Sequence, residues 1–268
     1  MLFAMKKKYL SELYIYPVKS CKGMSLRSVN VGAKGPLMDR RWMFVDKAGR
    51  FLSQRSLAKL ALIHVQLDDH FLFLSAPTTM PLMIPYGAIG DPCEVEVWND
   101  RLLAHDMGDK ASLWATSYLG QEARLVFLPD DSHRYVGEKY GKEAEAGFAD
   151  RLPFLLLSSA SLADLNRRVG MNLRINRFRP NLVIENCEPY EEDRWKRVRI
   201  GKIIFHFVKP CSRCIVTTIN QERAEADSEP LTTLATFRKE EGKILFGQNL
   251  IHEGTGILEV GQEVELLE

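Results

Sequence analysis

The chain has 268 residues and a mass of 30.6 kDa, and its 46% hydrophobic and 26% charged residues are typical of a globular protein with one large or two ordinary domains. Lys and Arg number 36 and Asp and Glu number 35, so the net charge of +1 disfavours a nucleic-acid partner but leaves room for a local basic pocket. Five cysteines are too few for a disulfide scaffold, no apolar run reaches the roughly 20 residues of a membrane helix, and residues 1–8 lack the order of a secretory signal. We therefore expect a cytoplasmic protein with no membrane segment.

Short strands joined by polar turns are predicted for the first hundred residues. Apolar, aromatic and β-branched residues alternate there in short runs, and Asp, Asn and Gly mark turns at residues 46–49, 68–70 and 99–100. Strands of this length and spacing are typical of an all-β barrel or sandwich. The predicted strands cover residues 9–18, 25–31, 42–45, 50–54, 61–67, 71–75, 94–98 and 101–104.

Helices are predicted only in the second half of the chain. The clearest helix covers residues 158–169, where Ser158 or Ser161 can cap the start and Gly170 ends it. The polar segment 130–145 is predicted to be a mobile loop. We expect a mainly β protein of two β-rich parts, with two to four helices concentrated after residue 105. The other predicted helices cover 109–119 and 231–239, and further strands cover 181–185, 198–200, 203–208, 215–219 and 256–267.

Cys211 and Cys214 have the spacing C-x-x-C in a turn between two predicted strands. Half of a zinc site would need a second ligand pair, and no other cysteines or histidines have that spacing. A thioredoxin-type redox pair would need a following helix, whereas a strand is predicted at 215–219. A single thiolate could instead ligate a soft metal, with Ser212 and Arg213 beside it. From this loop alone, two buried cysteines that fill a turn remain the simplest interpretation.

Two further segments are rich in cations. Arg177 and Arg179 stand at positions i and i+2 of a predicted extended segment, so they point to one face, where paired guanidinium groups suit a phosphate or a carboxylate. Lys19 and Ser20 follow the first strand, within the segment 16–23, where a lysine, a hydroxyl and backbone N–H groups could cradle an anion. An isolated Arg-x-Arg is more often a solvated strand edge, so neither segment alone identifies a site.

Several common catalytic patterns are missing from the sequence. It contains no G-x-S-x-G, no G-x-G-x-x-G, no Walker loop and no iron–sulfur spacing C-x₄-C-x₂-C, and its six histidines are scattered. These absences leave serine hydrolases, dinucleotide-binding proteins and ferredoxins without support.

Taken together and in this order, seven motifs resemble those of the MOSC-domain proteins, and in particular the subgroup with an N-terminal MOSC-associated β-barrel domain. That subgroup includes the amidoxime-reducing components and bacterial proteins that detoxify N-hydroxylated bases. The resemblance covers essentially the whole chain. The motifs are the segment 16–23, Asp39-Arg40, Pro153 to Ser158, Ala160 to Asn166, Asn176 with Phe178 to Asn181, Cys211 to Cys214, and Phe246 to Gln248.

The resemblance implies a molybdenum cofactor (molybdopterin), in which a pterin that carries a phosphate holds the metal through a dithiolene. It implies that Cys214 is the catalytic cysteine and the metal ligand, and that Asp150 is the second catalytic residue. Arg151 and Leu152 stand where some relatives have small polar residues, so the substrate preference of those relatives is not carried over. The residues implied to hold the phosphopterin are Lys19, Ser20, Arg40, Arg179, Asn181, Ser212 and Arg213.

The implied activity is that of a molybdenum-dependent oxidoreductase that reduces small N-hydroxylated compounds, namely amidoximes, hydroxylamines and N-hydroxylated bases, as a detoxification. Since neither a ferredoxin domain nor a membrane anchor is found, we expect a separate electron-transfer protein of the ferredoxin or flavoprotein type as a partner. The alternative is a non-catalytic carrier of the molybdenum cofactor or of sulfur. We expect residues 1–105 to form the N-terminal barrel domain, with 1–41 packing on the catalytic domain, and 106–268 to form the MOSC domain.

Overall fold

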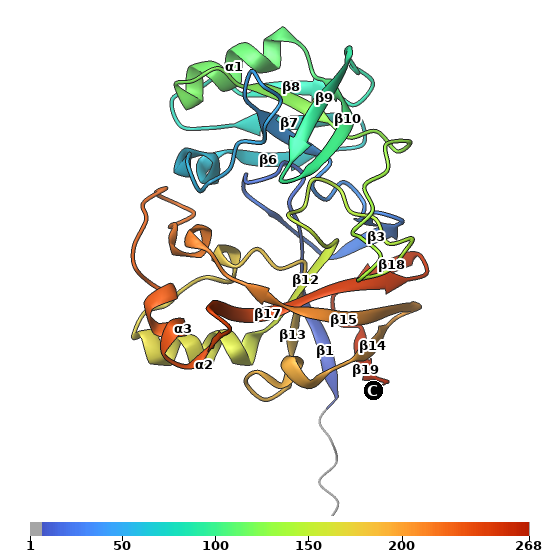
Figure 1. Cartoon of the computed structure of the whole chain (residues 1–268), viewed down its shortest axis with the longest axis vertical. Coiled ribbons are helices and arrows are strands. Elements are labelled where there is room, and N and C mark those ends of the chain that lie inside the picture. The colour runs from blue at the N-terminus through green and yellow to red at the C-terminus, as the bar shows by residue number, and fades with distance from the viewer. Residues whose placement is uncertain (1–6, 268) are drawn as a thin grey trace, which may run out of the picture.

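The computed structural model describes residues 7–267, and within that range the chain is mainly β with three α-helices, all of them after residue 105, as the sequence predicted. Two parts of the molecule lie one above the other in Figure 1. The upper part contains β6 to β10 and the helix α1, and the lower part contains β1, β12 to β15, β17 and β19 with the helices α2 and α3. Residues 1–6, the apolar start of the chain, lie outside the described residues.

A closed barrel of seven strands forms the lower part. Around the barrel the strands follow the order β12, β13, β1, β19, β14, β15 and β17, and β17 pairs with β12 to close it. Every neighbouring pair is antiparallel except β12 and β13, and closure leaves these strands without unpaired edges. The bounds are β1 (Lys8–Ile15), β12 (Phe154–Ser158), β13 (Leu182–Glu185), β14 (Arg197–Ile200), β15 (Ile203–Ser212), β17 (Lys243–Glu253) and β19 (Glu263–Leu266).

The first strand belongs to this barrel although it starts the chain. In β1, Tyr9 lies opposite Glu185 of β13 and Lys8 lies opposite Val264 of β19. Leu10, at the centre of β1, is fully buried in the barrel core. The segment after β1 also packs there, because it supplies strands that pair with β1 or with a C-terminal strand. These are β2 (Met24–Leu26), which pairs with β1, and β3 (Ser28–Gly32), which pairs with β4 (Gly35–Pro36) and β18 (Gly256–Glu259).

The upper part has a core of its own. Trp42 and Phe44 are buried in one apolar cluster with Ala111 and Ala115 of α1 (Asp109–Leu119), and both alanines have almost no exposed surface. The predicted division after residue 105 falls before the last residue of β10 (Asp100–Asp106), within this upper part. The strands are β5 (Trp42–Val45), β6 (His64–Leu67), β7 (Phe71–Ser75), β8 (Leu82–Pro85), β9 (Pro92–Val97), β10 (Asp100–Asp106) and β11 (Arg124–Phe127), in the sheets β5-β11-β10-β9 and β6-β7-β8.

Helix α2 (Ser159–Val169) confirms the clearest helix of the sequence. The Ser158 hydroxyl accepts the N–H of Ser161 at 3.0 Å, and Gly170 ends the helix in the left-handed conformation. The carboxylate of Glu192 accepts the Ser158 hydroxyl at 2.9 Å, which fixes the start of the helix against the barrel. The third helix, α3 (Leu231–Phe237), lies close to its predicted place. Within residues 7–267, none of the helices has the length and apolar character that a membrane span requires.

The strand predicted at 215–219 is wrong. Residues Ile215–Thr218 form a 3-10 turn, η4, because the threonine hydroxyls bond to the backbone inside the segment. Thr217 Oγ1 donates to the Cys214 carbonyl at 3.0 Å and Thr218 Oγ1 to the Ile215 carbonyl at 2.8 Å.

The extended segment predicted around Arg177 and Arg179 is also wrong. Arg177 ends the 3-10 turn η2 (Ile175–Arg177), and Arg179 has a φ of 56°, in the left-handed region. Nor do residues 50–54 form a strand: they make only isolated bridges to β5 and β9, because the Asp46 carboxylate holds the preceding turn by accepting the N–H groups of Ala48 and Arg50.

Candidate functional site

One cavity of about 230 Å³ is lined by all nine residues that the sequence proposed for the site. They come from the end of β15, from the loops that follow β1 and β15, and from the loops that precede β5, β12 and β13, so segments far apart in the sequence meet here. The nine residues are Lys19, Ser20, Arg40, Asp150, Arg179, Asn181, Ser212, Arg213 and Cys214.

The lining of this cavity is strongly basic. Among its lining residues, seven carry a cation and one, Asp150, carries a carboxylate. The near-neutral net charge of the chain therefore conceals a concentrated positive potential, which favours an anionic ligand. The cations are Lys19, Arg40, Arg55, Arg151, Arg177, Arg179 and Arg213.

Tyr16 holds two of these cations together. The guanidinium of Arg40 lies 4.5 Å from the centre of the Tyr16 ring, and that of Arg179 lies 4.2 Å from it. Arg179 also donates to the Cys21 carbonyl at 2.7 Å. Burial lowers the pKa of Arg179 to about 10, so it still carries its charge at neutral pH.

Asn181 supports this pair instead of offering a free amide. Its Oδ1 accepts from Arg40 at 3.0 Å and from the Leu155 N–H at 3.2 Å, and its Nδ2 donates to Tyr14 O at 3.1 Å and to Asp39 Oδ1 at 3.2 Å. Because its side chain is 1% exposed and bonded on both ends, Asn181 acts on the cavity through Arg40.

Three residues of the lining have a left-handed backbone. The φ angles of Ser20, Arg40 and Arg179 are 68°, 49° and 56°, a conformation that non-glycine residues seldom adopt. Such backbones cost of order 1–3 kcal/mol each and gather where a site requires them. Three separate loops thus each bring a left-handed residue to the wall of this cavity.

Arg213 carries a buried donor with no acceptor. Its Nε donates to Phe246 O at 2.7 Å and its Nη1 to Phe178 O at 2.9 Å, whereas its Nη2 is buried and finds no partner in the described part of the chain. Gly247 permits this placement, since a Cβ there would lie 3.1 Å from Nη2 and 2.8 Å from Leu156 O. An unpaired buried donor costs roughly 1–3 kcal/mol, and an anion in the cavity would remove that cost.

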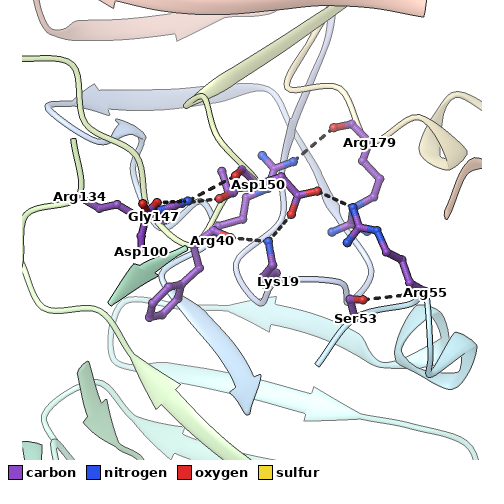
Figure 2. Close-up of polar contacts among 11 residues, drawn as sticks. Lys19, Arg40, Ser53, Arg55, Asp100, Arg134, Gly147, Asp150 and Arg179 are labelled. Carbon is purple, nitrogen blue, oxygen red and sulfur yellow. Dashed lines mark hydrogen bonds and ion pairs between the residues drawn. The ribbon is translucent and has the colours of Figure 1, made fainter. Parts of the chain in front are cut away.

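Asp150 is held by two cations, as Figure 2 shows. Lys19 Nζ lies 2.5 Å from its Oδ1 and Arg55 Nη2 lies 2.9 Å from its Oδ2. Burial alone would raise the pKa of Asp150, but the charges of Lys19 and Arg55 outweigh it and hold that pKa far below its usual range. Burial dominates at Lys19, whose side chain is 5% exposed, and lowers its pKa to about 8.

The loop that carries Asp150 is anchored by Arg134, which is 4% exposed. Arg134 donates to Gly147 O at 2.9 Å and to Asp150 O at 3.3 Å, and its Nε donates to Asp100 at 2.9 Å (Figure 2). The segment 130–145 has no helix or strand, as predicted, but through Arg134 it is fastened to the site.

The sequence reasoning missed Arg55 and Arg134. Arg55 directly follows the predicted strand 50–54, and Arg134 lies in the polar segment 130–145, while the partner that both share, Asp150, lies in neither segment. No local pattern marks such residues.

The cysteine loop brings two thiols to the cavity wall. Cys211 and Cys214 are unpaired thiols, both half-buried, and both line the cavity, while Cys214 stands directly before η4. Among residues 7–267, no group of three or more His, Cys, Asp or Glu side chains could hold a metal ion, so a protein-only zinc site has no ligand set there.

Comparisons with known proteins agree with this arrangement. The MOSC N-terminal beta barrel domain matches residues 7–122 and the MOSC domain matches residues 143–265. Mitochondrial amidoxime-reducing component 1 of Mus musculus is 34% identical over 278 residues, covering 96% of this chain and 82% of that protein; its counterpart in Homo sapiens is 35% identical over 282 residues, with the same coverage. The molybdenum cofactor sulfurase of Oryza sativa subsp. japonica is 31% identical over 270 residues, which are 91% of this chain but 32% of that protein.

Proposed function

Because this chain belongs to the family in which a MOSC N-terminal beta barrel domain precedes a MOSC domain, we propose that its cavity binds a molybdenum cofactor and that the protein reduces N-hydroxylated compounds. The observation that carries the proposal is that two thiols, one carboxylate and seven cations from separate segments line a single cavity. The names of the mammalian relatives, which describe amidoxime reduction, support the reaction class.

The residues present fit such a cofactor. Its phosphate needs cations and N–H donors, and Arg213 Nη2 is a buried donor that has no acceptor among the described residues. Arg40 and Arg179, stacked on Tyr16, supply a second pair of guanidinium groups, and Lys19 a further charge. The metal of the cofactor needs a soft ligand, and the Cys214 thiol on the cavity wall is one.

The bound cofactor would supply the two-electron chemistry that removes oxygen from nitrogen, with uptake of two protons and release of water. The side chains of the cavity would bind the cofactor and orient the substrate beside it. Asp150 is ionised at neutral pH and its side chain is 55% exposed, so it can accept hydrogen bonds from the N–H and O–H groups of an incoming substrate beside Cys214. Asn181 keeps Arg40 in place, and Arg134 keeps the loop of Asp150 in place.

We further propose that the electrons come from a separate electron-transfer protein and that the protein works in the cytoplasm. Among the described residues, Cys211 and Cys214 are the only thiols in the cavity lining, and because Cys214 is assigned to the metal, no thiol pair is left there to store two electrons. The alternative function, a non-catalytic carrier of the cofactor or of sulfur, would use the same cavity, and the partial match to a sulfurase keeps it as the second candidate.

A measurement of catalytic turnover distinguishes the reductase from the non-catalytic carrier. The protein purified from a host that makes the cofactor, with reduced methyl viologen as the electron source, should convert benzamidoxime to benzamidine, and Cys214→Ala should abolish that conversion. Chromatography of the product measures the rate. Full molybdenum occupancy with no benzamidine formed would favour the carrier.

A further inference from the structure

Arg55 joins three features of the cavity that come from different parts of the chain. It lies in the loop between β5 and the 3-10 turn η1 (Ala58–Leu62) of the upper part. Its Nη2 donates to Asp150 Oδ2 at 2.9 Å, and its guanidinium lies close enough to the Cys214 side chain to interact with the sulfur. Its guanidinium carbon lies 4.7 Å from the centre of the Trp98 ring. Figure 2 shows Arg55 and Lys19 approaching Asp150 from different loops.

These contacts fix the guanidinium plane. A guanidinium is a rigid fork whose N–H groups point in set directions, so two acceptors and one stacked ring leave it little freedom. Trp98 is itself held, since its ring packs on Phe51 with the two centres 5.1 Å apart. The guanidinium of arginine stays protonated in proteins, so Arg55 brings a permanent charge to this end of the cavity.

We propose that Arg55 is a positioning residue of this site, which holds the Asp150 carboxylate and the Cys214 sulfur at the same end of the cavity and so sets the orientation in which a substrate can use both. The proposal rests on the proposed function for the nature of that substrate, an N-hydroxylated compound. It does not make Arg55 an anchor of the cofactor phosphate, because Arg40 and Arg179, stacked on Tyr16, and Arg213, with its buried unpaired donor, are the residues proposed for that role.

Removing the fork would release Asp150. Its carboxylate would keep a single cation, Lys19, and since more than half of its side chain is exposed it could turn toward solvent. A lysine at position 55 would keep the charge but could not bond both acceptors with the same rigidity. The loss should therefore fall on the rate of the reaction more than on substrate affinity, since a misplaced group near the reacting atoms costs catalytic rate.

The test compares Arg55→Gln, Arg55→Lys and the control Arg101→Gln, which removes one exposed charge from β10 outside the cavity lining. In cofactor-loaded protein, Arg55→Gln should lower kcat for benzamidoxime about tenfold or more and change KM less than about threefold. Its molybdenum content should equal that of the wild type, and the electron paramagnetic resonance signal of the partly reduced metal should shift. Arg55→Lys should recover part of kcat, and the control should match the wild type.

An unchanged resonance signal together with an unchanged kcat in Arg55→Gln would overturn the proposal. So would a loss of molybdenum in proportion to the loss of kcat, which would make Arg55 a cofactor anchor. If the wild type fails to reduce benzamidoxime, the proposed function fails, but the resonance comparison still tests the contact of Arg55 with Cys214. Circular dichroism melting of each variant separates these outcomes from a failure to fold.

Discussion

Lys19 is a buried residue of the cavity lining whose ammonium group pairs with Asp150. Its pKa of about 8 lies below the ordinary lysine value of 10.5, because burial disfavours the ammonium more than Asp150 favours it. Between those two values the unfolded chain binds more protons than the folded chain, so the contribution of Lys19 to folding stability rises as the pH rises from 8 toward 10.5.

Urea unfolding of the cofactor-free protein at pH 7 to 10 checks this sign. The free energy of unfolding of the wild type minus that of Lys19→Met should increase by about 1 to 3 kcal/mol between pH 8 and pH 10. Taking the difference removes the tyrosines and cysteines that both proteins share. A difference that stays flat or falls over that range would mean that Lys19 keeps an ordinary pKa.

The sequence indicated some of the residues of the site and could not indicate others. Lys19, Arg179 and Cys214 stand in short motifs whose cations and thiol suit a phosphate and a soft metal, so a family resemblance could carry them. The roles of Arg55 and Arg134 depend on their contacts with Asp150, 95 and 16 residues away, and on the folded path of the chain between them. A contact that forms only through tertiary folding produces no characteristic residue spacing in the sequence, so no motif could have predicted it.

At the scale of the element, β17 shows how one backbone position serves the cavity. Gly247, near the middle of the strand, has a φ of 79° and sits where a Cβ would press on Leu156 O and Arg213 Nη2. Gly242, in the turn before the strand, has a φ of 77° but nothing within 4 Å of such a Cβ. An alanine would meet the same backbone strain at either position, but only at position 247 would its Cβ also clash with neighbouring atoms.

Gly242→Ala should therefore lose about 1 kcal/mol of folding stability and keep its molybdenum. Gly247→Ala should lose about 1–3 kcal/mol more, from overpacking, and should retain less molybdenum because Arg213 is displaced. Urea unfolding and metal analysis of both variants measure this. Equal destabilisation with equal molybdenum content would show that Gly247 has no part in placing Arg213.

Helices and strands that are determined by nearby residues were predicted correctly from the sequence. Segments in which side chains hydrogen-bond to the backbone in place of a strand partner were not. Helix α2 could be placed because Ser158 caps it and Gly170 ends it, both of which are local chemistry. The apolar and β-branched run 215–219 read as a strand, but the hydroxyls of Thr217 and Thr218 satisfy nearby carbonyls and turn the chain. That turn brings Cys214 to the cavity wall.

At the scale of the whole molecule, the barrel is closed by a strand from the beginning of the chain. The residue pattern of the first segment predicted the strand β1. Such a pattern does not show which strands β1 pairs with, and its partners β13 and β19 lie much later in the sequence. This pairing delivers the segment with Lys19 and Ser20 to the loops with Arg179 and Cys214. The cavity is therefore a product of the assembled chain and of no single motif.

The ratio of molybdenum to protein tests this account most directly. Purified from a host that makes the cofactor, the wild type should hold about one molybdenum per chain and no stoichiometric zinc. Cys214 lies in the cavity lining as a ligand for the metal, and the described residues offer no zinc ligand set. Cys214→Ala should change the spectroscopic signature of that metal, whereas Cys211→Ala should leave the signature and most of the activity. One zinc per chain without molybdenum would contradict the account.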